Sequence, residues 1–520
     1  MEIIKSMEHV LNRIFLIILS VVFFALSVWT YAHNYINTDL TDEHPILVDN
    51  SLILNGVLVL IALMFFCFIY ENNHLAKIIN EINLSKLAMA ISFIASILAL
   101  IWVLICGAGP VADQRMICIA ASEFNQGDYS LLGKGEYMSI YPQNLGLVSL
   151  MRVLFILFGD GNYVAFQICS AISVFFIVYG IYLFSSLVSS NRVIQLMSMI
   201  MAFLCIPMYL YAPFVYGELL STAFAFWGLI YFEKISQHFN IINIVGLLLT
   251  FFFAITFRKN TLIFVVAIFC VCITKIVLRQ NWGRYLCVII LLLLAMKLNS
   301  VGTNLLYGAH MEENSKGMPA ILWIQMGLNS TESKFGYGWD DRSALTIFEN
   351  NDYDPEASKE EAIGIINSFW EDNGASPDKL IAFYGTKIAT QWMNPMYQGF
   401  VMNNNIEREQ KWFANTLYSS EVIWKIFNKY MNIYQIIVYL GTVFSGIYFI
   451  RTKIGMEKLV GMIVVFGGFI FSIIWEAKTR YVFPYVLVLI PYSMVGMEKL
   501  LKYLFNKIKM VKNNESINTK

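Results

Sequence analysis

Charged side chains are scarce in this sequence. Only 14% of its 520 residues are Asp, Glu, Lys or Arg, whereas 58% are hydrophobic and 15% are aromatic. Soluble globular chains usually carry about 25% charged residues and roughly 45–50% apolar ones. The shortage of charge therefore excludes a cytosolic enzyme, a disordered tail and a coiled-coil rod.

An excess of basic residues is also missing, because 36 Lys and Arg balance 36 Asp and Glu. Nucleic-acid binders usually present a basic face, so we expect no nucleic-acid partner. Cysteine is sparse as well, and seven of the eight cysteines lie within apolar runs. Cys270 and Cys272 stand close together without a second pair. We therefore expect neither a disulfide scaffold nor a cysteine metal site.

Long apolar runs, in contrast, are abundant. A helix needs about 20 predominantly apolar residues to cross the hydrocarbon core of a bilayer. The candidate spans lie near 14–32, 51–71, 86–107, 162–188, 193–211, 213–232, 241–256, 261–278, 285–300, 433–450, 459–475 and 481–498. One more apolar run, 145–158, is shorter than these and carries Arg152 in its middle, which favours an interfacial or re-entrant helix.

The distribution of Lys and Arg predicts the topology. With twelve spans both termini are cytoplasmic, and the basic loops fall on the inside, as the positive-inside rule requires. The loop 33–50, which contains Asp39, Asp42, Glu43 and Asp49 but no Lys or Arg, then lies outside. If 145–158 crossed the bilayer, the later basic loops would move outside, so we expect twelve spans.

The sequence thus predicts an all-α polytopic protein of the cell membrane with about 12 transmembrane helices. Four segments share its outer face: 108–144, 257–260, 301–430 and 476–480. The expected parts are an N-terminal two-span extension 1–85, a transmembrane core 86–300 with the outer loop 108–144 and the interfacial helix 145–158, a mostly helical extracytoplasmic domain 301–430, C-terminal helices 431–500 and a basic cytoplasmic tail 501–520.

The outer loop 108–144 holds the first candidate site. Asp113 follows the end of a span by a few residues, and an ionisable group at this depth is a functional candidate. A solvated loop acid is the alternative. The loop continues with Asp128, then with Tyr141-Pro142 and Asn144, and leads into the short helix. We expect Asp128, Tyr141 and Asn144 to contribute to substrate binding.

This order resembles the first outer loop of the GT-C glycosyltransferases, in particular the family-39-type protein mannosyltransferases and aminoarabinose transferases. The likeness extends in architecture over roughly residues 86–500. It implies that Asp113 is the catalytic acidic residue, whereas Asp128 has no equally clear counterpart. In that family the motif follows the first span, but here it follows the third, which points to a two-span addition at the N-terminus.

The second candidate is Phe257-Arg258-Lys259-Asn260, between two apolar runs. Basic residues on the outer face depart from the positive-inside preference. Arg258, with Lys259, is a candidate to bind the phosphate of a lipid-linked sugar, because the planar fork of arginine suits phosphate. Snorkelling of these side chains to lipid headgroups is the alternative.

The third candidate runs from Glu476 to Arg480-Tyr481 and Pro484. This pattern resembles a late motif of bacterial GT-C sequences, which implies that Arg480 and Tyr481 line the donor site. If the segment is helical, Glu476 and Arg480 share one face, and a structural ion pair is the alternative. Glu218, at the outer end of another run, is a candidate to contact the acceptor or to orient Arg258.

The polar segment 301–430 allows two interpretations. Its aromatic residues beside carboxylates are typical of sugar-binding surfaces, but an ordinary packed cap explains the same residues and is the favoured interpretation. Asp340 and Asp341 could bind a divalent cation. Two adjacent acids do not define a site, so no cofactor is assigned.

The expected function is a membrane glycosyltransferase. Asp113 would act as general base in an inverting transfer of sugar from a polyprenyl-phosphate donor to an extracytoplasmic glycan, lipid-linked glycan or protein. A surface-polysaccharide polymerase or ligase, a lipid-linked sugar transporter or flippase, and a non-catalytic scaffold are the alternatives.

Overall fold

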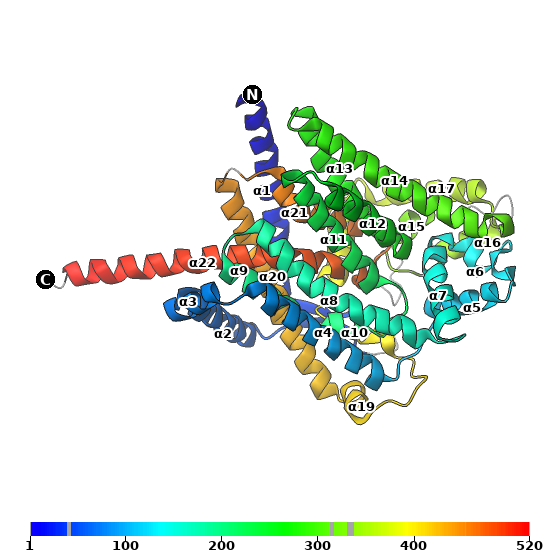
Figure 1. Ribbon diagram of the computed structural model, residues 1–520, viewed down its shortest axis with the longest axis horizontal. Helices are drawn as coiled ribbons and strands as arrows, with labels where there is room; N and C mark the ends of the chain where they lie inside the picture. The colour runs from blue at the N-terminus through cyan, green and yellow to red at the C-terminus, as the bar shows by residue number, and fades with distance from the viewer. Residues whose placement is uncertain (1, 39–42, 312–316, 330–336, 453, 519–520) are drawn as a thin grey trace.

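The computed structural model confirms a nearly all-α fold (Figure 1). It describes all residues except 1, 39–42, 312–316, 330–336, 453 and 519–520, so Asp39 and Asp42 lie outside the described residues. The strands found in the described part are β1 (His33–Ile36) and β2 (Ile46–Asp49), which pair antiparallel. This hairpin connects the first two long helices.

Nine helices in the described residues are long and apolar enough to cross a membrane, which is compatible with a multi-pass membrane protein. Many of their large apolar side chains are exposed, as lipid-facing surfaces require. The nine are α1 (Glu2–Ala32), α2 (Leu52–Glu71), α4 (Leu84–Cys106), α8 (Tyr163–Val188), α13 (Leu262–Val277), α14 (Trp282–Tyr307), α20 (Glu421–Arg451), α21 (Val460–Ile474) and α22 (Phe483–Asn518).

Three of the twelve predicted spans are not among these nine. The run 193–211 is divided into α9 (Arg192–Phe203) and α10 (Ile206–Leu210), with a proline in the first turn of α10. The helix α11 (Glu218–Gln237) carries charge at both ends. Helix α12 (Ile241–Phe257) has only 17 residues, whereas α13 and α21 reach 19 residues together with the 3-10 turns before them, Lys259–Val277 and Met456–Ile474. The number twelve therefore stays a prediction.

The segment after α4 folds into short helices at one end of the bundle. They are α5 (Asp113–Asn125), η1 (Ser130–Leu132), α6 (Tyr137–Ile140), η2 (Pro142–Asn144) and α7 (Leu145–Phe158). The chain bends by 99° between residues 130–140 and 142–158. With 14 residues, α7 is about 21 Å long and too short to cross the core alone. Its Arg152 donates to Asn125 Oδ1, 3.0 Å away.

The described residues of the polar segment contain seven further helices. They are η4 (Gly308–His310), α15 (Ala320–Met326), α16 (Ser343–Asn350), α17 (Pro355–Asn373), α18 (Pro377–Trp392), η5 (Val401–Asn403) and α19 (Trp412–Ser419). Helices α15–α17 gather beside α5–α7 at the right of the view in Figure 1, and Met318 N donates to Ile140 O there. The flanking helices reach into the predicted segment 301–430, because α14 ends only at Tyr307 and α20 already begins at Glu421.

The N-terminal extension is packed into the fold. Helix α1 runs along α20, and Tyr35 N in β1 donates to Met393 O, 3.1 Å away, after α18. Helices α2 and α3 (Asn73–Glu81) follow the hairpin. The first 85 residues are therefore part of the body of the protein.

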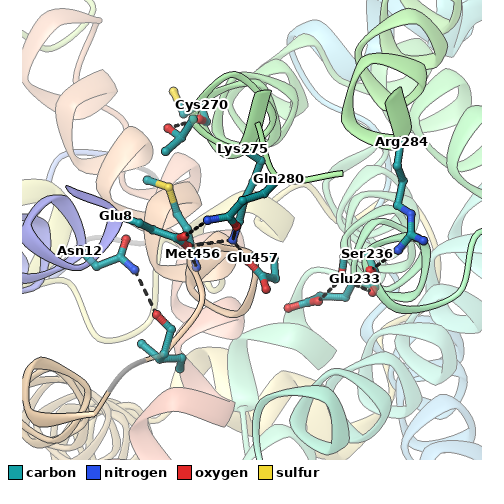
Figure 2. A network of polar contacts seen from close by, with 12 residues as sticks. Glu8, Asn12, Glu233, Ser236, Cys270, Lys275, Gln280, Arg284, Met456 and Glu457 are labelled. Carbon is teal, nitrogen blue, oxygen red and sulfur yellow. Dashed lines mark hydrogen bonds and ion pairs between the residues drawn. The ribbon is translucent and has the colours of Figure 1, made fainter. Parts of the chain in front are cut away.

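A buried polar cluster ties three separate parts together (Figure 2). The Lys275 ammonium, at the end of α13, lies 2.8 Å from Glu8 Oε1 in α1 and 2.7 Å from Glu457 Oε2 in η6 (Met456–Leu459). Gln280 Nε2 and Met456 N also donate to the Glu8 carboxylate. The cluster joins α1, α13 and the segment before α21.

We expect Lys275→Met to lower stability by roughly 3–5 kcal/mol, because it leaves the buried Glu8 carboxylate and the partly exposed Glu457 carboxylate without their cation. The apparent Tm in detergent measures this loss. Lys297→Met, which removes an exposed lysine from α14, is the matched control and should keep the wild-type Tm. Equal Tm values for both variants would contradict the structural role of Lys275.

Candidate functional site

A cavity of about 460 Å³ lies at the end of the bundle where the outer loop and the polar segment meet. It gathers residues from segments that are far apart in the sequence, including most of the predicted site. Its charged lining residues are Glu43, Asp113, Arg258, Lys259, Asp340, Glu476, Lys478 and Arg480. Four acids and four bases thus share one space.

Asp113 is the first residue of α5 and is partly exposed. The loop before it is held by the distant segment 405–411, since Glu407 N and Arg408 N both donate to Gly107 O. The next residue, Gln114, is buried, and its Oε1 accepts from Val215 N at 2.8 Å. These contacts place Asp113 at the cavity wall beside the chain that leads into α11.

Arg258 and Glu218 form a buried ion pair. Arg258 Nη2 lies 3.0 Å from Glu218 Oε1, and the two side chains are 13% and 5% exposed. Arg258 also lies over the ring of Tyr216, 4.6 Å from its centroid. Gly217 makes the turn into α11 with φ +84°, and a Cβ there would lie 3.0 Å from Phe257 O. The glycine allows Tyr216, Glu218 and Arg258 to come together.

Arg480 approaches the same glutamate from the short segment just before α22. Its Nε is 3.9 Å from Glu218 Oε1, and its guanidinium carbon is 5.3 Å from the centroid of the Tyr216 ring. The side chain is only 10% exposed, and its Nε has no hydrogen-bond partner in the described part of the chain. A buried donor without a partner is costly, so this arginine is suited to bind an anion in the cavity.

The segment 475–482 is not an α-helix. It is extended up to Lys478 and then forms η7 (Thr479–Tyr481), so Glu476 and Arg480 do not share a helical face as a helix would place them. Glu476 instead accepts from the Tyr481 hydroxyl at 2.5 Å. Burial raises the pKa of Glu476, although Lys478 acts against the shift.

Lys259 lies in η3 (Lys259–Thr261), next to Arg258. Its ammonium donates to Asn299 Oδ1 in α14. Asn299 in turn donates to Thr256 Oγ1 at 2.8 Å. Lys259 therefore lines the cavity with its position set by neutral groups.

An ion pair from the N-terminal extension completes this wall. Glu43 Oε2 lies 2.8 Å from Lys478 Nζ, and the Glu43 carbonyl accepts from Gln398. Burial alone would raise the pKa of Glu43, but the charges of Lys478 and Arg480 lower it to about 2. Glu43 was only an outer-loop acid in the sequence, where nothing indicated its contact with a residue 435 positions away.

Aromatic and amide side chains also line the cavity. Tyr141 and Asn144 line it, and the Asn144 amide donates to the Tyr216 hydroxyl at 3.4 Å. Trp323 and Trp475, whose rings stack at 5.7 Å, also line it, as does Asp340. Sequence reasoning assigned no role to these two tryptophans or to Lys478.

Two predicted residues have other contacts. Asp128 is exposed, is absent from the cavity lining, and accepts from Ser130 N as a turn-capping residue. Asp341 accepts from Ser343 N at the start of α16, whereas its neighbour Asp340 faces the cavity. No group of three or more His, Cys, Asp or Glu residues suited to a metal ion occurs in the described residues.

Comparison with known proteins gave no match among protein families, curated proteins or solved structures. Any functional assignment must therefore start from the geometry of this cavity and from its residues.

The Glu43–Lys478 pair predicts a specific pH dependence. Because the folded-state pKa of Glu43 is lowered from 4.5 to about 2, its contribution to stability is present above pH 4.5 and is lost as the pH falls toward 2. Glu43→Gln should be less stable than wild type at pH 7, and this difference should shrink below about pH 5.

Denaturant titrations between pH 2 and 7 measure this difference. Glu81→Gln changes an exposed acid of the same N-terminal extension and is the control, for which we expect little effect. A difference between Glu43→Gln and wild type that stays constant with pH would contradict the pairing.

Proposed function

We propose that this protein is an integral-membrane glycosyltransferase that moves a sugar from a polyprenyl-phosphate donor to an extracytoplasmic acceptor. The observation that carries the proposal is the cavity itself. One carboxylate with a partly exposed side chain, Asp113, and a buried arginine with an unpaired donor, Arg480, line the same space.

The arginine pair suits a phosphate group. Glu218 lies beside both Arg258 and Arg480, and the Arg480 Nε still has no hydrogen-bond partner in the described part of the chain, so the two guanidinium groups keep donors for an added anion. In the transfer step the bond between the anomeric carbon and the phosphate oxygen breaks. The leaving lipid phosphate gains a negative charge, which these guanidinium groups stabilise.

Asp113 supplies the second requirement. The acceptor hydroxyl attacks the anomeric carbon on the side opposite the phosphate and gives its proton to the Asp113 carboxylate. A new carbon–oxygen bond replaces the old one, and direct displacement inverts the anomeric centre. Tyr141, Asn144 and the two stacked tryptophans would hold the sugar and the acceptor.

The position of the arginines favours a donor anchored in lipid. A smaller cavity of about 30 Å³ shares Arg258, Arg480 and Tyr481 with the large one and is also lined by Phe264 and Tyr485 of the membrane helices α13 and α22. A phosphate bound here would lie where polar cavity and apolar helices meet. A lipid-linked donor presents its phosphate at this depth.

The proposed topology has twelve spans, both termini in the cytoplasm and the cavity on the extracytoplasmic face of the cell membrane. The helices α9, α11 and α12 would be the three further spans that bring the nine long helices to twelve. Nucleotide sugars stay in the cytoplasm, which is why an outward-facing enzyme needs a lipid-linked donor.

The variant Asp113→Asn tests the general base. We expect transfer to fall by about 10²–10⁴-fold, because the amide cannot accept the proton, while donor binding persists. Turnover of a polyprenyl-phosphate sugar by protein in vesicles measures it. Asp128→Asn, outside the cavity, is the control.

Unchanged turnover in Asp113→Asn would exclude this residue as the base. Activity with a diphosphate-linked oligosaccharide but not with the monophosphate sugar would instead identify a polymerase or ligase of surface polysaccharide.

The variant Arg258→Lys tests phosphate binding while leaving a cation beside Glu218. Lysine lacks the planar fork, so we expect kcat/KM for the donor to fall by about 10–100-fold. Arg284→Lys is the control, since Arg284 donates to the Ser236 carbonyl in another part of the bundle. Equal values for the two variants would contradict a role of Arg258 in donor binding.

A further inference from the structure

A second, larger cavity of about 840 Å³ lies away from the candidate site, between α2, α9 and α20. Its walls are almost entirely apolar. They include Leu58 and Phe65 of α2, Met197 and Ile200 of α9, and Ile426 and Ile433 of α20. The spacing of seven residues within α2 and within α20 shows that each helix presents one continuous face to the groove.

Helix α2 is loosely covered by the rest of the protein. Only Asn55 and Phe66 are buried along its 20 residues, and the groove separates part of it from α9. In a bilayer such an apolar space is filled by hydrocarbon, because water inside it would lose hydrogen bonds.

One end of the groove carries two lysines of α20, Lys425 and Lys429. Lys429 donates to Asn50 Oδ1 and to Asn55 Oδ1, both at 2.8 Å. Asn55 is itself buried and held by donation to the Tyr31 carbonyl at 2.8 Å. The position of the Lys429 ammonium is thus set by neutral amide oxygens.

The charge of Lys429 has no carboxylate partner in the part of the chain that the structure describes. Lys425 pairs at 2.6 Å with Glu421, and both side chains are largely exposed. The groove therefore ends in an excess of positive charge. An anion at its mouth would meet a cation that is already oriented.

The lysine end lies on the same side of the bundle as the candidate site. Asn50 follows β2 directly, and Glu43, in the turn of the same hairpin, lines the cavity of the candidate site. The apolar remainder of the groove extends along α2 and α20 toward the opposite side. Such a distribution matches a lipid whose headgroup and chain occupy different depths.

We propose that this groove binds an anionic phospholipid, with one acyl chain between α2, α9 and α20 and its phosphate at Lys429 and Lys425. Basic residues beside gaps between membrane helices are a recurring way to bind anionic headgroups. The lipid completes the packing of the N-terminal extension against the core. The inference needs the multi-pass arrangement of the helices and is independent of sugar transfer.

Native mass spectrometry of the full-length protein, equilibrated with equal amounts of phosphatidylglycerol and phosphatidylcholine, tests the proposal. We expect wild type to retain phosphatidylglycerol preferentially. Lys429→Met should reduce this preference by about fivefold, the effect of one lysine near a charged lipid surface. Lys425→Met should also reduce it, while the hydrogen bonds of Lys429 to Asn50 and Asn55 stay intact. Lys297→Met, which removes an exposed lysine of α14, should leave it unchanged.

Filling the groove tests the acyl chain separately. Leu58→Trp places a large side chain in the lining and should lower the number of retained lipids, whereas Leu60→Trp, at an exposed position outside the lining, should not. Unchanged retention in Leu58→Trp would overturn the proposal, as would equal retention of both lipids by wild type. A dimer that Leu58→Trp abolishes would also overturn it, because a second copy would then occupy the groove.

Discussion

Two arginines, with side chains 13% and 10% exposed, share one buried glutamate, and the candidate site depends on this arrangement. Arg258 follows α12, Glu218 begins α11 and Arg480 lies in η7 just before α22, so the ends of three helices must meet for the charges to compensate each other. Charges with so little exposure are costly unless they are paired. Among these three side chains two cations face one carboxylate, which is the basis of the proposed phosphate binding.

The walls around this cluster come from parts of the chain that have no local relation to one another. The hairpin of the N-terminal extension brings Glu43 to Lys478, and segment 405–411 holds the loop that positions Asp113. Helix α13 links the cavity to the buried cluster around Lys275. Helix α13 starts at the cavity and ends at the Lys275 cluster, about 24 Å away for its 16 residues. Cavity and cluster thus hold α13 from both ends.

Local sequence patterns succeeded where the physical signal is local. Apolar runs indicated the nine long helices. Charged groups at the ends of such runs must lie at a helix end or in a cavity, and Asp113, Arg258 and Arg480 line one cavity, while their roles stay a prediction. The patterns failed where packing decides the conformation. Spacing suggested a helical pair of Glu476 with Arg480, but the segment is extended there, and Glu476 contacts Tyr481 instead. Asp128, placed in the site by its neighbours in sequence, caps a turn.

The amino-acid sequence alone is enough to predict that the chain is helical, that nine of the helices in the described residues are apolar enough for a membrane, and that charge gathers at certain helix ends. Hydrophobicity and helical periodicity act over a few turns, so they can be read from neighbouring residues. The packing of the whole chain sets which helix ends meet, brings the N-terminal extension into the body, and places Glu43 and Lys478 at the same cavity as Asp113. Contacts between residues hundreds of positions apart follow from the packing of whole helices, and no spacing along the chain encodes them.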